Sequence, residues 1–375
     1  MNDIRLFKSQ SIVNLVIKTA GNACNIDCEY CFEKKKIVSS HCMTKSVFGM
    51  LIRSVTNQCT IVFHGGEPLL IGKENFRKLL EIIRPYYPDK VIAVRIQTNG
   101  TLLDQEYSAL FFDTFSDLNI EIAISVDGME SMNRLRVDGA GRSTFSRVMD
   151  AFSRVEEYGQ KVGLLSVISR DSLKMATQYV EFLSTIPNLM FVKMNPLFNL
   201  RNNQLSRDSI TPMEYAKFVY EVFNAYIAMQ LYRSIPIEPI LSMLQRINHR
   251  KSRYCNYSSR KCFYHLSVYP DGRLGPCDCL SINDFPLGDI QSVGDGGLDS
   301  FLHLLDWRQP TRLLQNLIDS CVDCDIRYFC MGGCLSQRFY FRRNEELSAD
   351  FCASKHYLER KLRMFAVQSQ TDGKI

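Results

Sequence analysis

No apolar run in this 375-residue sequence approaches the length of a membrane span, and residues Met1 to Gln10 lack the apolar stretch of a signal peptide. The sequence has neither internal repeats nor low-complexity segments, and one charge sign barely exceeds the other, with a formal net charge of +5. We interpret the short basic runs, such as Lys34–Lys36 and Arg246–Arg253, as solvated surface. These absences predict a cytoplasmic protein with no nucleic-acid or membrane partner.

Cysteine, in contrast, is abundant, with 14 residues. Disulfides are not expected, because nothing in the sequence points to export. A reduced, cysteine-rich chain is more often a metal protein, so the spacing of the cysteines carries the argument.

From Ile12 to about Asn195, apolar strands alternate with amphipathic helices. The expected strands are 13–17, 60–63, 91–97, 120–125, 162–168 and 190–194, and the clearest helices between them are 76–83, 145–158 and 173–183. This alternation predicts an α/β fold with a parallel sheet and crossover helices. Six units rather than eight predict a partial (β/α)6 TIM-like barrel.

Beyond the barrel, residues 199–212 read as a polar linker and residues 213–230 as a long helix. After about Lys251 the pattern changes to short segments and many turns. A region so poor in regular apolar pattern usually needs metal ligation to hold it together.

A first group of cysteines directly follows the first strand, in the stretch GNACNIDCEYCF. Cys24, Cys28 and Cys31 have C-x3-C-x2-C spacing, and three thiolates on one loop can hold three irons of a [4Fe–4S] cluster. A zinc loop is the alternative. The motif resembles that of the radical S-adenosylmethionine (radical SAM) superfamily. That resemblance implies that the fourth iron binds S-adenosylmethionine and that Tyr30 lies near the adenine.

Further motifs follow later strands. HGGEPLL contains Gly65, Gly66, Glu67 and Pro68; glycines let the backbone approach a ligand, and a carboxylate accepts hydrogen bonds from an ammonium group. The superfamily has a GGEP element here that contacts the amino group of S-adenosylmethionine.

Polar side chains also follow the third and fourth strands, in IQTNGTLL and ISVDG. The resemblance implies cofactor contacts for Gln97 and Asn99, ribose contacts for Ser125 and Asp127, and a carboxylate contact for Arg136. Asn-Gly and Asp-Gly also make ordinary turns, so it is the order of the motifs, each after an expected strand, that carries the argument.

A second group of cysteines lies in the C-terminal third. Eight thiolates suit two fully ligated four-iron clusters, with a zinc ribbon as the alternative. The spacing and the stretch VYPDGRLGPC resemble the SPASM domain of peptide- and protein-modifying radical enzymes. That resemblance implies one ligand set of Cys255, Cys262, Cys277 and Cys334, and a second of Cys321, Cys324, Cys330 and Cys352.

Three cysteines stand outside these ligand sets. Cys279 competes with Cys255 as a ligand, while Cys42 and Cys59 are expected to be ordinary buried thiols. Together the resemblances imply a radical SAM barrel in residues 1–235, a linker helix and SPASM domain in 236–365, and a tail in 366–375. They also imply S-adenosylmethionine and three [4Fe–4S] clusters as cofactors.

The expected reaction is radical hydrogen abstraction from a residue of a peptide or protein substrate, with electrons from a donor such as flavodoxin or ferredoxin. Asp278 is the candidate base, because sulfatase-maturating enzymes have an aspartate after the corresponding cysteine; an aspartate that caps a turn is the alternative. The expected product is a thioether or carbon–carbon crosslink or an oxidised residue.

Other functions stay open. Anaerobic sulfatase maturation, which converts Cys or Ser to formylglycine, is one alternative. His64 replaces the glutamine that commonly precedes the GGEP glycines in those enzymes, and VNLVIKTAGNAC lacks their proline-containing approach. A small-molecule dehydrogenase and a zinc-binding interaction protein are the others.

Overall fold

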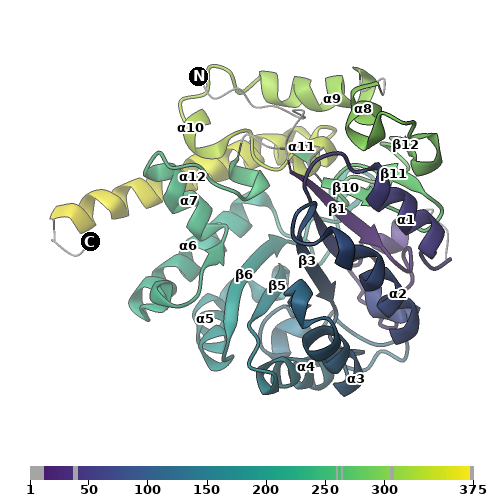
Figure 1. Cartoon of the computed structure of the whole chain (residues 1–375). Helices are drawn as coiled ribbons and strands as arrows, with labels where there is room; N and C mark the ends of the chain where they lie inside the picture. Colours follow the sequence, from purple (N-terminus) through teal and green to yellow (C-terminus); the bar gives the residue numbers. More distant parts are fainter. Residues whose placement is uncertain (1–11, 37–40, 259–260, 263–264, 305–307, 372–375) are drawn as a thin grey trace.

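The computed structural model describes residues 12–36, 41–258, 261–262, 265–304 and 308–371. Six parallel strands alternate with helices along the first half of the chain, in the order β1 to β6 (Figure 1). Their bounds are Val13–Lys18, Cys59–His64, Val91–Thr98, Glu121–Ser125, Val162–Ile168 and Leu189–Pro196. The partial barrel expected from the sequence is confirmed.

The crossover helices lie around the outside of the curved sheet (Figure 1). They are α1 (Lys45–Ser54), α2 (Lys73–Ile83), α3 (Gln105–Ala109), α4 (Phe145–Glu157) and α5 (Ala176–Thr185). Each buries one apolar stripe; in α4 the buried side chains include Val148, Phe152 and Val155, which recur at the spacing of a helix face.

One predicted helix begins later than expected. Residues Arg170–Lys174 form a 3-10 turn that starts at a Ser169 capping box, and Met175 then leaves helical geometry before α5 begins. The expected start at residue 173 was therefore wrong, because local hydrogen bonding of two serines interrupts the periodic pattern.

The C-terminal third adds strands to the same sheet. β9 (Ile237–Glu238) pairs with β6, and β10 (His265–Val268) pairs with β1 in parallel. β11 (Arg273–Gly275) and β12 (Gly288–Asp289) continue outward from β10, which completes a ten-stranded sheet. The sheet thus crosses the boundary expected after residue 235, and the division of the chain into domains stays a prediction.

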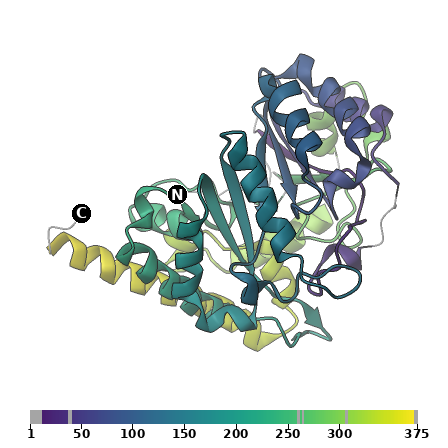
Figure 2. The same ribbon diagram turned by 90° about the horizontal axis from the view of Figure 1, so that it is seen from below.

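The remaining helices cover this end of the molecule. They are α6 (Pro212–Ala228), α7 (Ile240–Ile247), α8 (Gly297–Leu304), α9 (Arg308–Asp319), α10 (Arg327–Cys330), α11 (Leu335–Phe341) and α12 (Glu345–Thr371). The Asp350 carboxylate of α12 accepts a hydrogen bond from the backbone N–H of Met213. Figures 1 and 2 show α12 beside α6, with its end extending away from the sheet. Within the described residues, no helix is long and apolar enough to cross a membrane.

The segment 199–212, expected as a polar linker, is more ordered than that. It contains the short hairpin β7 (Leu200–Arg201) and β8 (Gln204–Leu205), and Phe198 packs edge-on against Phe341 of α11 at 5.8 Å between ring centroids. Asn203 is in left-handed geometry and accepts a hydrogen bond through its carbonyl from Asn344. Contacts with the C-terminal helices therefore organise a segment with little apolar pattern of its own.

Phe63 of β2 lies at the centre of an aromatic group in the core. It is fully buried, with Phe48 at 6.0 Å and Phe76 at 4.8 Å between ring centroids. Such a group links a strand to both helices that cover it.

We expect Phe63→Ala to lower the free energy of unfolding by about 3–5 kcal/mol, because the cavity left in a packed core adds to the lost transfer free energy. Urea denaturation followed by circular dichroism under anaerobic conditions measures this. Leu241→Ala, at a side chain that is 38% exposed, is the control and should change little. Equal effects of the two substitutions would contradict the central place of Phe63.

Candidate active site

The loop after β1 carries the first three cysteines at the carboxyl edge of the sheet, where barrel active sites lie. The backbone N–H of Cys31 donates to the carbonyl of Cys28 at 3.2 Å, and the Asn99 side-chain amide lies 3.5 Å from the Cys24 sulfur. Burial raises the pKa of Cys24 to about 11, and the nearby Glu67 carboxylate and Cys28 thiol add to this increase. The three side chains thus lie close together in a partly enclosed place, which suits thiolate ligation by a metal cluster.

Gly65 and Gly66 pack directly against this loop. The N–H of Gly66 donates to the carbonyl of Gly21 at 3.1 Å, and a Cβ on Gly66 would lie 1.9 Å from the carbonyl oxygen of Ala23. Gly65 has a φ of +128°, which favours glycine. The structure therefore requires glycine here for a second reason besides the ligand approach expected from the sequence. Without side chains, Gly65 and Gly66 can pack directly against the cysteine loop and support it.

Glu67 is fully buried and follows these glycines. Its carboxylate accepts hydrogen bonds from the Thr98 hydroxyl at 2.7 Å, from the Asn99 backbone N–H at 2.8 Å and from the Leu69 N–H at 3.0 Å. Burial raises the pKa of this carboxyl to about 7, even though these hydrogen bonds favour the ionised form. The site thus contains a fixed acceptor that an incoming ammonium group can neutralise.

Buried Asp127 and Arg136 form a second group with the half-buried Tyr30. The Tyr30 hydroxyl donates to Asp127 at 2.7 Å and accepts from Arg136 at 2.8 Å. The other oxygen of Asp127 accepts from the backbone N–H of Val167 at 3.0 Å. Both oxygens of Asp127 therefore already have protein partners, and its expected ribose contact stays a prediction.

The Nε of Arg136 is buried and has no hydrogen-bond partner among the described residues. A buried guanidinium N–H without an acceptor is costly, and a carboxylate is its usual partner. Arg136 thus fits the carboxylate contact with S-adenosylmethionine that the resemblance implies.

The other expected cofactor residues are at the same edge of the sheet. Gln97 lies in β3, Ser125 ends β4, and both are half-buried. Pro68 begins a 3-10 turn, and its carbonyl accepts a hydrogen bond from the Thr19 hydroxyl at 3.1 Å. The structure brings these residues to one mouth, and their contacts with a ligand stay predictions.

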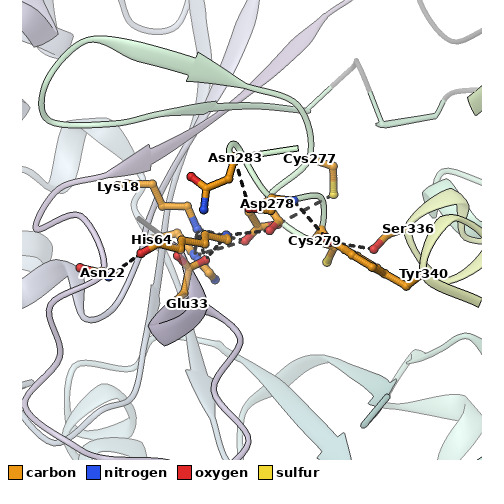
Figure 3. A network of polar contacts seen from close by, with 12 residues as sticks. Lys18, Asn22, Glu33, His64, Cys277, Asp278, Cys279, Asn283, Ser336 and Tyr340 are labelled. Atoms are coloured by element: carbon orange, nitrogen blue, oxygen red, sulfur yellow. Dashed lines mark hydrogen bonds and ion pairs between the residues drawn. The ribbon is translucent and has the colours of Figure 1, made fainter. Parts of the chain in front are cut away.

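Sequence reasoning missed the most highly charged group at this mouth. Lys18 ends β1, and its buried ammonium group donates to Glu33 at 2.7 Å, to His64 at 3.1 Å and to Asp278 at 3.2 Å. Figure 3 shows these four side chains turned toward one another. The available signal was a lysine at the end of a mostly apolar strand.

Lys36 is also buried, although we had interpreted the run Lys34–Lys36 as surface. It donates to Glu33 at 2.7 Å and to the backbone carbonyl of Asp278 at 2.7 Å. The interpretation was wrong for this lysine because Glu33, within the same turn, draws it inward.

The expected base, Asp278, thus belongs to an ion-paired network. Burial opposes its ionisation, but Lys18, His64 and Lys36 outweigh burial and hold the pKa of its carboxyl well below the usual range. Its place between the two cysteine regions fits the expectation, whereas so low a pKa weakens it as a proton acceptor. Its role as base stays a prediction.

The C-terminal cysteines lie in two groups, and none of the fourteen thiols forms a disulfide. Electrostatic interactions link Cys334 to Cys255 and Cys279, and Cys277 to Cys262 and Cys279. Cys279 thus joins the first group, so the competition between Cys255 and Cys279 stays open. In the second group, Cys324 interacts with Cys321 and Cys352, and Cys330 with Cys321.

Two buried lysines face these thiols. Lys261 donates to three backbone carbonyls and interacts with cysteines of both groups; Lys355 interacts with Cys330, Cys334 and Cys352. Neither lysine has a carboxylate partner among the described residues. Buried ammonium groups beside thiols fit anionic metal–thiolate clusters, which supply the missing negative charge.

The two remaining cysteines differ from each other. Cys59 is fully buried in β2, as expected. Cys42, which we expected to be buried, is exposed, because it lies in the loop before α1 rather than in an element of the core.

Comparison with known proteins agrees with this geometry. Residues 19–183 match the model of the radical SAM superfamily. The cysteine-type anaerobic sulfatase-maturating enzyme of Clostridium perfringens (strain ATCC 13124) is 27% identical over 337 residues, which cover 86% of this chain and 88% of that protein. The serine-type enzyme of Klebsiella aerogenes is 27% identical over 86% of this chain and 79% of its own length.

Solved structures are also similar. Native anSMEcpe with bound AdoMet superposes with a TM-score of 0.80 at 25% identity, and covers 96% of this chain and 100% of that chain. Streptococcus suis SuiB bound to S-adenosylmethionine has a TM-score of 0.62 at 15% identity, which shows a shared fold over 88% of this chain and 74% of that chain. Residues 19–183 thus match the radical SAM family, whose members use S-adenosylmethionine with a [4Fe–4S] cluster, and the chain is an enzyme similar over most of its length to sulfatase-maturating enzymes.

Proposed function

We propose that this enzyme modifies a residue of a peptide or protein substrate, by oxidising it or by crosslinking it. One observation carries the proposal: Lys18, at the end of β1, contacts Asp278, which directly follows Cys277 of the C-terminal region, at 3.2 Å. The loop that would hold the radical cluster and the loop that would hold an auxiliary cluster thus meet at one buried site.

The contacts suggest a separate role for each group of residues in the site. Cys24, Cys28 and Cys31 would hold the cluster to which S-adenosylmethionine binds, and this cofactor supplies a radical that removes hydrogen from an unactivated carbon. Glu67 would bind the ammonium group of S-adenosylmethionine, because burial raises the pKa of its carboxyl and a cation would stabilise the ionised form. Arg136 would bind the carboxylate of S-adenosylmethionine, because its buried Nε has no acceptor among the described residues. Asp278 would orient or deprotonate the residue being modified.

Formylglycine formation and crosslinking are both candidates. The similarity to sulfatase-maturating enzymes over 86% of the chain favours oxidation of a cysteine or serine in a sulfatase. His64, in place of the glutamine common in those enzymes, favours a different peptide and hence a crosslink or another oxidised residue. We further propose an electron donor such as flavodoxin or ferredoxin, and cytoplasmic location.

We expect Glu67→Gln to weaken binding of S-adenosylmethionine at least about tenfold, because a neutral amide cannot neutralise an ammonium group in a buried place. Equilibrium dialysis with labelled S-adenosylmethionine on the reconstituted enzyme measures this. Glu74→Gln, at an exposed residue that pairs with Lys78 on α2, is the matched control. Unchanged affinity in Glu67→Gln would place the ammonium group elsewhere.

The three ligand sets predict about twelve irons per reconstituted chain. Replacing Cys24, Cys28 and Cys31 together by Ala should leave about eight, and replacing Cys321, Cys324, Cys330 and Cys352 together should also leave about eight. Iron and sulfide analysis with Mössbauer spectroscopy measures both. A colourless C-terminal region that binds zinc would contradict the auxiliary clusters without affecting the radical SAM assignment.

The substrate test is anaerobic incubation with S-adenosylmethionine, dithionite and a sulfatase peptide containing Cys-x-Pro-x-Arg. Mass spectrometry follows 5′-deoxyadenosine and the peptide together. Loss of sulfur with gain of an aldehyde oxygen identifies formylglycine formation. Deoxyadenosine formation with an unchanged peptide instead favours another peptide, to be tested for crosslinks. Absence of deoxyadenosine from a fully loaded enzyme would contradict the proposal.

A further inference from the structure

The Lys18 ammonium group lies among acceptors from three separate parts of the chain. Glu33 follows the last cysteine of the first loop, His64 ends β2, and Asp278 follows β11. These three residues offer ligand atoms within 4.8 Å of one another, an arrangement that resembles a metal site. Lys18 Nζ, however, lies within 3.2 Å of all three ligand atoms, so the ammonium group already fills the place of a cation.

The chemistry of an ammonium group determines the tautomer of His64. A protonated lysine has three donors and no acceptor. Burial disfavours the charge on Lys18, but Glu33 and Asp278 outweigh burial and raise the pKa of Lys18. Nδ1 of His64 lies 3.1 Å from Lys18 Nζ and 3.4 Å from the Asp278 carboxylate, and among the described residues it hydrogen-bonds with Lys18 alone. Because the ammonium group can only donate, Nδ1 accepts, and a neutral imidazole then carries its proton on Nε2.

Charge compensation keeps this imidazole neutral. Two ammonium groups, Lys18 and Lys36, face two carboxylates, Glu33 and Asp278, so the network is balanced without a proton on His64. Burial, together with Lys18 beside it, lowers the pKa of His64 to about 4, while Asp278 and Glu33 act in the opposite direction.

The other ring nitrogen remains available. His64 Nε2 makes no hydrogen bond within the described part of the chain, and the side chain keeps 12% of its surface exposed. His64 directly precedes Gly65 and Gly66, so its ring lies at the mouth of the barrel beside the cysteine loop.

We propose that Lys18 is a positioning residue that fixes His64 as a neutral imidazole, whose Nε2–H is offered to a carbonyl or carboxylate oxygen of the bound substrate. The identity of that acceptor rests on the proposed function. The tautomer and charge of His64 follow from the network alone, so the charge can be tested without a substrate.

The test is hydrogen–deuterium exchange at the imidazole C2 of His64 in the holoenzyme, read by peptide mapping with mass spectrometry. The rate of this exchange follows the neutral fraction of the imidazole, whichever ring nitrogen carries the proton, and N-acetylhistidine under the same conditions is the reference. With a usual pKa of about 6.5, the reference should react about tenfold more slowly at pH 5.5 than at pH 8. His64 should keep more than about half of its pH 8 rate at pH 5.5, because it stays unprotonated.

Lys18→Met removes the cation but keeps most of the side-chain volume. His64 then faces Glu33 and Asp278 with Lys36 as the only ammonium group, so its pKa should rise and its rate at pH 5.5 should fall at least about fivefold relative to pH 8. Lys73→Met is the control, because Lys73 pairs with Asp104 and Glu106 in an exposed place. This control should leave the pH profile of His64 unchanged.

Two outcomes would overturn the inference. One is a wild-type profile that follows N-acetylhistidine. The other is an unchanged profile in folded Lys18→Met, with iron content as the check of folding. If that variant does not fold, the wild-type profile still decides the charge of His64. Failure of the peptide assay affects none of these results.

Discussion

A buried ammonium group has to be neutralised, and in this enzyme that requirement holds the active site together. Lys18 has no exposed surface, and its acceptors come from positions 15, 46 and 260 residues away along the chain. An ammonium group left in the interior without these partners would cost several kcal/mol. The cysteine loop, the end of β2 and the loop after β11 therefore converge on one point.

The pairing of β1 on both sides makes this convergence possible. β2 and β10 both run parallel to β1, so the carboxyl ends of all three strands lie together. His64, at the end of β2, therefore lies beside Lys18, whereas Asp278 reaches Lys18 from the loop after β11, which runs antiparallel to β10. The region expected to bind auxiliary clusters is thus built onto the barrel sheet itself, which fixes its position relative to the first cysteine loop.

Local signals in the sequence were sufficient for much of this structure. The period of the apolar residues predicted β1 to β6, because each is a buried strand followed by a turn and an amphipathic helix. The C-x3-C-x2-C spacing predicted the radical SAM domain, because close spacing along the chain keeps the three thiols on one loop.

Features that depend on distant partners could not be predicted. Glu33 and Lys36 look like surface charges beside Lys34 and Lys35, but Glu33 is buried against Lys18, and Lys36 against Glu33 and the backbone carbonyl of Asp278. The pairing of β10 with β1 could not be predicted from the sequence either, because His265–Val268 is short and lies far from Val13–Lys18 along the chain. The hairpin within 199–212 likewise depends on contacts with the C-terminal helices.

The late position of β10 has a consequence for biosynthesis. While the ribosome is still making the chain, β1 can pair with β2 but has no partner on its other side until residues 265–268 emerge. An apolar strand with one open edge is prone to pair with other chains. Most of the polypeptide must therefore be translated before its first strand is protected, and cysteines 24, 28 and 31 are attached to that strand throughout this interval.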